Sequence, residues 1–321
     1  MVRSCQFKEL KAKKKACLEK ITVLVPMYNA GKTVAKCVKS IMAQTYTNLE
    51  IIVVDDGSSD DSYEIVNQLA ATDKRIRLFH KENEKSLAKT RQYLIDKVIT
   101  EYFVFIDSDD VVKRKYVEHL YHAMIKYDAD CVASNFKING IIPFSNIFSG
   151  TKVINNDDIL STAILSKNIH YVAWNKMYKT SIMRQAEIDT SINFGEDFLR
   201  CYEYFRLCKK VVFINRYDYK YILTKGSMIH SKFSEGNVIF LDWLEAAARN
   251  ENVIQNQRAL KAWIAFTSAS FKYLMKKSKY KDAALTQRLN ANILQYHDDF
   301  MKNKFSSKIY KLAYRFTKGI K

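Results

Sequence analysis

Residues that interrupt regular structure are scarce in this chain. Of its 321 residues, only 8 are glycine and 2 are proline. This scarcity excludes a collagen-like chain and a chain dominated by flexible linkers, and it favours long helices and strands. The length is enough for one large domain or two smaller ones, each with a buried core.

Cysteine is also scarce and follows no recognisable spacing. The six cysteines are Cys5, Cys17, Cys37, Cys131, Cys201 and Cys208. They include no CxxC pair and no zinc-ligand spacing, so the pattern favours a reduced compartment over a disulfide framework. The N-terminal segment lacks the apolar core of a signal peptide, and no stretch approaches the roughly 18 to 20 apolar residues of a membrane span. We therefore expect a cytoplasmic protein.

Acidic residues are outnumbered by basic ones. The chain has 34 Asp and Glu against 52 Lys and Arg, a formal net charge of +18. Such a surface attracts anions, which could be nucleic acid, acidic lipid or phosphorylated substrates. The lysines concentrate at both ends, in residues 8–20 and 302–321.

The first 110 residues alternate between two patterns. Apolar, β-rich runs occur at residues 21–29, 49–54, 75–80 and 102–107. Segments with helical spacing lie between them, at residues 31–44, about 60–71 and 87–99. Ser58 or Ser59 is the expected N-cap of the second helix. The alternation is typical of a parallel, doubly wound α/β sheet, and past about residue 235 the pattern becomes helical.

Polar loops follow these strands, at residues 26–29, 55–60, 83–91 and 107–110. Carboxyl ends of parallel strands meet at one edge of a sheet, where open α/β folds bind ligands, so we expect the loops to converge.

The last loop carries Asp107, Asp109 and Asp110. Mutual repulsion makes this cluster costly unless a cation, a hydrogen-bond network or water compensates for it. One explanation is a bound cation. The alternative is that the acids stabilise a helix that starts near Lys113.

Residues 21–62, followed later by VFIDSDD at residues 104–110, resemble the GT-A fold glycosyltransferases of family 2. The resemblance extends from about residue 21 to about residue 231. It implies an α/β fold of the GT-A type, a doubly wound mixed sheet with a C-terminal helical extension. It also implies that Pro26, Tyr28 and Asp56 border the nucleotide base and that the DSD segment binds a metal.

The chemistry of a nucleotide-sugar explains why acids are needed here. A divalent cation such as Mg²⁺ or Mn²⁺ on the diphosphate neutralises charge as the glycosidic bond breaks. Hard cations bind carboxylate oxygens, and residues at i and i+2 beyond a strand can point to one side. We expect Asp107 and Asp109 to share a sugar-nucleotide and its metal, with Asp109 as the direct ligand.

A second acidic motif is Gly195-Glu196-Asp197, which begins a predicted helix. In the family, a Glu-Asp pair that opens a helix supplies the general base, and the resemblance assigns that role to Asp197. An inverting transfer needs one carboxylate to accept the proton of the acceptor hydroxyl. The alternative is that the two acids only stabilise the helix N-terminus through its dipole.

Weaker resemblances suggest further contacts. Trp174 could stack on a sugar ring or fill the core. Asn83 and Arg91 are expected nucleotide contacts, although Lys85 stands where the family has glycine. In residues 219–231, Lys225, Ser227 or His230 could contact phosphate or metal, and His230 is the candidate metal ligand.

Two features bear on where and how the enzyme would act. The family's processive synthases have a Gln-x-x-Arg-Trp motif and membrane spans, and their absence here suggests that one sugar is added per encounter. In residues 303–321, apolar residues recur every three or four positions beside a stripe of basic residues. This predicts a helix lying on anionic lipid, and the alternative is a helix packed on the catalytic domain.

The sequence as a whole predicts three parts: a basic extension at residues 1–20, a catalytic domain at 21–231, and a helical region at 232–321. The catalytic domain divides into a nucleotide-sugar half at 21–110 and an acceptor half at 111–231.

The predicted function is inverting, metal-dependent transfer of one sugar, from a UDP-linked donor to a hydroxyl of a lipid-linked or surface glycan or glycolipid. The protein would act as a peripheral protein on the inner face of the cell membrane. A sugar nucleotidyltransferase would need a Gly-rich, Arg-containing loop, which residues 25–33 do not supply. A basic nucleic-acid-binding protein would leave the acidic loops unexplained.

Overall fold

The computed structural model describes residues 19–141, 150–165, 171–223 and 232–303, together with residues 311 and 314. The predicted contacts of Lys225, Ser227 and His230 lie outside the described residues, as do nearly all of the basic extension and most of the C-terminal tail.

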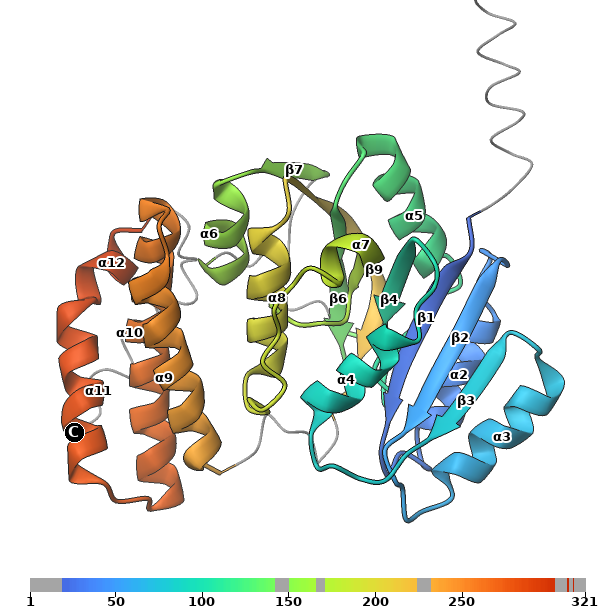
Figure 1. The fold of residues 1–321 in the computed structure, drawn as a ribbon, viewed down its shortest axis with the longest axis horizontal. Helices are drawn as coiled ribbons and strands as arrows, with labels where there is room; N and C mark the ends of the chain where they lie inside the picture. The colour runs from blue at the N-terminus through green and yellow to red at the C-terminus, as the bar shows by residue number, and fades with distance from the viewer. Residues whose placement is uncertain are drawn as a thin grey trace, which may run out of the picture.

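Within the described residues, nine strands form one mixed sheet (Figure 1). The strands are β1 (Ile21–Met27), β2 (Leu49–Asp55), β3 (Ile76–His80), β4 (Tyr102–Phe105), β5 (Val111–Val112), β6 (Cys131–Ile138), β7 (Lys152–Asn155), β8 (Lys176–Lys179) and β9 (Lys210–Tyr221). Their order is β3-β2-β1-β4-β8-β6-β9-β5, and β7 pairs with β9. The first four strands are parallel, and β8 runs antiparallel to both β4 and β6.

Helices cover both faces of this sheet. The helices before β9 are α2 (Val34–Met42), α3 (Ser62–Thr72), α4 (Leu87–Asp96), α5 (Tyr116–Tyr127), α6 (Asp158–Leu165), α7 (Thr180–Met183) and α8 (Glu196–Arg206). Every residue of β1 and β2 is buried, as expected of parallel strands covered on both sides. Side chains of α2, α3 and α5 pack on one face, and those of α4, α6 and α8 pack on the other.

The C-terminal region is a group of helices beside α6 and α8, shown in orange and red in Figure 1. Its helices are α9 (Glu235–Asn250), α10 (Ile254–Ser278), α11 (Ala283–Gln295) and α12 (His297–Met301). None of the described helices combines the length and apolar character needed to cross a membrane. The apolar faces of this region join the core on the α4 and α8 side of the sheet.

The predicted strands, the parallel order of the first half and the helical C-terminal region are confirmed. The predicted N-cap of the second helix is wrong, because α3 begins at Ser62 and follows Asp61. Ser58 Oγ instead donates to Asp55, and the Ser59 amide donates to Asn29 Oδ1 at 2.8 Å. These two serines therefore join the turns after β1 and β2.

Candidate active site

The turns after the parallel strands meet at the carboxyl edge of the sheet. In the strand register, Met27 of β1 lies opposite Asp55 of β2, and the Asp56 amide donates to the Met27 carbonyl at 2.8 Å. Pro26 is buried within β1, whereas Tyr28 is 51% exposed just beyond it. The Asp56 carboxylate is buried and forms an ion pair with Lys81. An exposed aromatic residue thus follows β1, and a carboxylate paired with a lysine follows β2.

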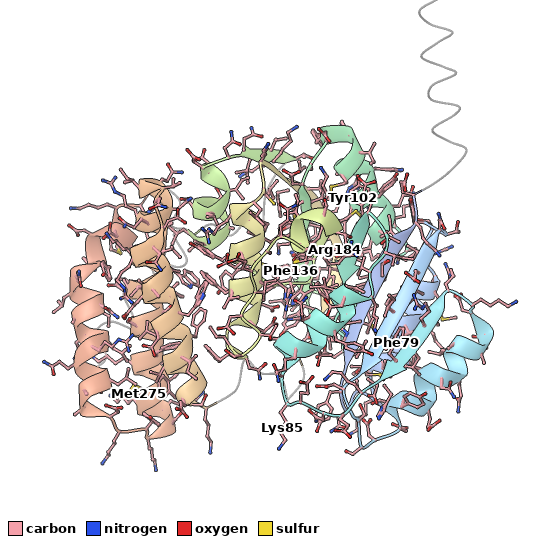
Figure 2. All side chains as sticks on the ribbon, viewed as in Figure 1. Phe79, Lys85, Tyr102, Phe136, Arg184 and Met275 are labelled. Carbon is pink, nitrogen blue, oxygen red and sulfur yellow. The ribbon has the colours of Figure 1, made fainter. Side chains whose placement is uncertain are left out.

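The turn after β2 also touches the turn after β3. Gly57 has a φ of +68°, and a Cβ built on it would lie 2.7 Å from the Asn83 amide nitrogen. Asn83 Oδ1 accepts a hydrogen bond from the Lys85 amide at 2.6 Å. Lys85 has a φ of +54°, which is the left-handed conformation that glycine favours. The lysine therefore keeps the backbone conformation expected of the family's glycine. Figure 2 shows its exposed side chain at the edge of the molecule, pointing away from it.

Arg91, on α4, joins the two acidic motifs. Its side chain is 1% exposed, and Nη2 donates to Asp107 Oδ1 at 2.8 Å. Nη1 donates to the carboxylates of both Glu196 and Asp197. Burial works to lower the pKa of Arg91, but the carboxylates of Asp197 and Asp107 hold it above its ordinary value. One guanidinium therefore holds the end of β4 against the start of α8.

The three acids after β4 occupy different environments. Asp110 is fully buried, and it accepts hydrogen bonds from the Tyr219 hydroxyl at 2.6 Å and the Ile222 amide at 2.8 Å. Asp107 and Asp109 are only partly buried. Asp110 is therefore a structural carboxylate, and the other two can face a ligand.

Burial and mutual repulsion perturb all three carboxyls. Burial raises the pKa of Asp109 to about 6, and the charge of Asp107 adds to the rise. Burial and Asp107 raise the pKa of Asp110 to about 8 against its two hydrogen bonds. Burial also raises the pKa of Asp107, although Arg91 opposes the rise. The positive charge of Arg91 therefore does not offset the burial and repulsion of these carboxyls.

A hard divalent cation fits this deficit. Mg²⁺ is usually bound by one or two carboxylates, with waters and substrate phosphates completing its coordination, and Asp107 and Asp109 supply two such carboxylates. In the described part of the chain, no three His, Cys, Asp or Glu side chains gather as a metal site of their own. The alternative role of the acids is wrong, because α5 begins only at Tyr116, after β5, with Lys115 as its N-cap.

The second acidic motif lies in the first turn of α8. Gly195, at the N-cap, has a φ of +76°. Glu196 points inward, and its side chain is 5% exposed, whereas that of Asp197 is 28% exposed. Both acids lie in the first turn, where their charge interacts favourably with the helix dipole, as the alternative interpretation requires. Of the two, Asp197 is the one whose side chain is accessible to a bound molecule.

Aromatic side chains of the C-terminal helices hold this turn in place. A Cβ on Gly195 would lie 2.5 Å from the ring of Phe240, on α9. The ring of Phe194 packs on Phe240 with a centroid distance of 5.8 Å, and the ring of Phe198 stacks on Trp263 of α10 at 5.8 Å. Both aromatic neighbours of the Glu196-Asp197 pair are thus inserted into the helical region.

Two buried cations near Asp197 were not predicted from the sequence. Arg200 is fully buried, with Nη2 donating to the Ala88 carbonyl at 3.1 Å and Nε 3.7 Å from Glu196 Oε2. Burial and the charge of Arg91 lower the pKa of Arg200 to about 10. The i, i+4 spacing of Glu196 and Arg200 is the sequence signal that could have revealed this pair.

The other unpredicted cation is Lys176. It is fully buried, and Nζ donates to the Val172 carbonyl at 2.7 Å and to Asn175 Oδ1 at 2.9 Å. Burial lowers the pKa of Lys176. Its signal in the sequence was a lysine two residues after Trp174, between Asn175 and Met177.

Trp174 itself lies in an aromatic stack. Its ring stacks with that of Tyr219, at a centroid distance of 4.7 Å, and with that of Tyr221, at 5.0 Å, and the residue is 5% exposed. These contacts fit a role for Trp174 in the core. Its contact with a sugar ring stays a prediction.

The chain is similar in sequence to known glycosyltransferases. The family model described as Glycosyl transferase family 2 matches residues 22–206. GlyA, a glycosyltransferase of Streptococcus pneumoniae serotype 4 (strain TIGR4), is 33% identical over 226 residues, which are 65% of this chain and 31% of GlyA. GlyG, a glycosyltransferase of the same strain, is 32% identical over 228 residues, 67% of this chain and 74% of GlyG. The chain thus spans about a third of GlyA and about three quarters of GlyG.

The fold also resembles a solved structure. That of S. aureus TarS residues 1–349 in complex with UDP-GlcNAc has a TM-score of 0.70 and 18% sequence identity, and it covers 93% of this chain and 88% of that one. At 18% identity the similarity is one of fold alone. Because the match covers 93% of this chain, the shared fold includes the C-terminal helices.

Proposed function

This chain belongs to glycosyltransferase family 2, and on that premise we propose that it moves one sugar, with inversion and with a divalent metal, from a UDP-linked donor to a hydroxyl of a surface glycan or glycolipid. The observation that carries the proposal is the guanidinium of Arg91, which contacts Asp107 and Asp197 at once. An acid suited to the donor diphosphate and an acid suited to the acceptor hydroxyl therefore lie on opposite sides of one side chain.

The donor would lie along the carboxyl edge. The exposed ring of Tyr28 offers a surface for the nucleotide base, with Pro26 and Asp56 beside it and Asn83 in the adjoining turn. TarS, which shares the fold, has been solved with UDP-GlcNAc, and this supports a UDP-linked donor. Asp107 and Asp109 would hold Mg²⁺ or Mn²⁺ against the diphosphate. The ion would neutralise charge on the leaving group as the glycosidic bond breaks.

Asp197 would act on the acceptor. Its carboxylate accepts the proton of the acceptor hydroxyl while that oxygen attacks the anomeric carbon from the side opposite the leaving phosphate. The bond from the anomeric carbon to the new oxygen forms as the bond to the diphosphate breaks, so the configuration inverts. Arg91 and the aromatic contacts of Phe194 and Phe198 hold Asp197 in place for this step.

We also propose that the acceptor is lipid-linked and that residues 303–321 bring the enzyme to an anionic membrane. Of this tail, the structure describes residues 303, 311 and 314, and Tyr314 is fully buried and donates to the Ile293 carbonyl at 3.2 Å. Part of the tail therefore packs on the helical region, and its lysines are the candidate lipid contacts. Co-sedimentation with phosphatidylglycerol vesicles tests this in Lys308→Gln/Lys318→Gln, which retains Tyr314. Unchanged binding would defeat the proposal.

The experiment that tests the proposed function is a screen of nucleotide-sugars for binding and turnover, with Mn²⁺ and with EDTA. We expect one UDP-sugar to bind and to be slowly hydrolysed only with the metal. Full turnover in EDTA would contradict the role of the metal, and binding of no nucleotide-sugar would contradict the function.

A further inference from the structure

A chain of ion pairs runs through the turn that follows β3. Lys81 Nζ forms an ion pair with Asp56 and donates to Glu84 Oε2 at 2.9 Å. Glu84 Oε1 accepts from Lys89 Nζ, on α4, at 3.1 Å. We call Asp56, Lys81, Glu84 and Lys89 the β3 ion chain. It connects the turn after β2 to α4 across the turn that carries Lys85.

Lys81 is the inner cation of the β3 ion chain. Its side chain is 12% exposed, against 46% for that of Lys89. Burial works to lower the pKa of Lys81, but the carboxylates of Asp56 and Glu84 hold it above its ordinary value. Nζ also donates to the Glu82 carbonyl at 3.3 Å, so its three N–H groups are occupied. The ammonium therefore has no N–H left for a ligand and can act on one only through its neighbours.

The two oxygens of the Asp56 carboxylate differ. Oδ1 is buried and faces Lys81 Nζ. Oδ2 accepts no hydrogen bond from any residue in the described ranges, and, unlike Oδ1, it is not sealed from solvent. Lys81 thus fixes one oxygen of the carboxylate and leaves the other as an acceptor that is open to a ligand.

We propose that Lys81 is a positioning residue that sets which nucleobase the donor carries. It holds Oδ1 of Asp56, so that Oδ2 accepts a hydrogen bond from a ring N–H of the nucleobase. This rests on the proposed function, in which Asp56 borders that base. Uracil has such an N–H at N3 and guanine at N1, whereas cytosine and adenine have a lone pair at the equivalent nitrogen. A carboxylate that faces a lone pair makes no hydrogen bond, so the site favours UDP over CDP.

A purely structural role for the β3 ion chain predicts a different result. UDP and CDP carry the same ribose and the same diphosphate. A looser turn, or the loss of a cation near the diphosphate, would therefore weaken the binding of both nucleotides alike. The ratio of the two affinities reports on the contact with the nucleobase alone.

Calorimetric titration of the full chain with UDP and with CDP, both in the presence of Mn²⁺, tests the proposal. We expect the wild type to bind UDP roughly 10- to 100-fold more tightly than CDP, which is the range that one hydrogen bond to a charged group supplies. In Lys81→Met this preference should fall to less than roughly threefold. Lys89→Met is the control, because it removes the same charge from the far end of the β3 ion chain, and it should keep the wild-type preference.

Asp56→Asn gives a second test that does not depend on the stability of Lys81→Met. Lys81 can donate only to the amide oxygen, so Nδ2 is turned towards the nucleobase. There it can donate to the ring nitrogen of cytosine but finds no acceptor in the N–H of uracil. The preference should therefore reverse, with CDP bound more tightly than UDP.

Three results would overturn the proposal while leaving the transfer reaction intact: equal binding of UDP and CDP by the wild type, the wild-type preference in Lys81→Met or Asp56→Asn, or the same loss of preference in Lys89→Met as in Lys81→Met. A wild type that binds neither nucleotide would overturn the proposal together with the proposed function. The two failures are therefore distinguishable in one set of titrations.

Discussion

Replacing Gly195 with alanine should destabilise the protein and displace Asp197. Gly195 has a φ of +76°, and an alanine in the left-handed region costs about 1–2 kcal/mol. Its Cβ would also lie 2.5 Å from the Phe240 ring, and forced overpacking costs about 1–3 kcal/mol. The free energy of unfolding should therefore fall by about 2–5 kcal/mol. A shift of the turn by about 1 Å would lower turnover on the order of 100-fold.

A double-mutant cycle separates the two costs. Phe240→Ala alone should cost about 3–5 kcal/mol, because it removes a buried ring. In that background the overlap is gone, so Gly195→Ala should cost only the conformational 1–2 kcal/mol, and the two changes should be non-additive by about 1–3 kcal/mol.

Gly140→Ala is the matched control for this cycle. Gly140 has a φ of +86° with nothing within 4 Å of an added Cβ, so only the backbone cost applies. Urea unfolding gives the free energies, and donor turnover gives the activity. Strict additivity of Gly195→Ala and Phe240→Ala would refute the contact between α9 and the turn that carries Asp197.

Three further predictions concern the charged side chains. Asp109→Asn should abolish the stimulation of turnover by Mn²⁺ while leaving the free energy of unfolding within about 1 kcal/mol of wild type; undiminished stimulation would remove Asp109 from the metal site. Asp110→Asn should retain transfer, because its Oδ1 can still accept from the Ile222 amide while its Nδ2 donates to the Tyr219 hydroxyl oxygen; a loss as large as that of Asp109→Asn would show a direct role in the reaction. Arg91→Lys should lower both turnover and the free energy of unfolding, the latter by about 3–5 kcal/mol, because a single ammonium cannot bind Asp107 and the acids of α8 together. Urea unfolding at fixed pH measures this loss, and a change under about 1 kcal/mol would contradict the bridging role.

Local patterns in the sequence were sufficient to predict the nucleotide half of the fold. The uninterrupted apolar runs of β1 and β2 indicate strands buried on both faces, and the helical spacing of Val34, Val38, Ile41 and Met42 predicts the inward face of α2, of which the first three are buried. Because the carboxyl ends of parallel strands lie at one edge of a sheet, the sequence also predicts that the polar loops converge there.

Contacts between distant segments could not be predicted in the same way. Arg91 is separated from Glu196 by 105 residues, and no local pattern indicates that one guanidinium binds both acidic motifs. The packing of Phe240 on Gly195 depends on how α9 returns to the catalytic half. The left-handed conformation of Lys85 contradicts the usual preference of a lysine, so the sequence alone could not show that the turn survives without glycine.

The most direct test of the account is to measure binding and transfer in Asp197→Asn, with Glu203→Gln on the same helix as a control. The account predicts that UDP with Mn²⁺ binds the wild type and both variants with the same calorimetric affinity. Transfer should fall by roughly 100- to 10,000-fold in Asp197→Asn alone. Transfer at the wild-type rate by Asp197→Asn would contradict the claim that this carboxylate accepts the proton of the acceptor.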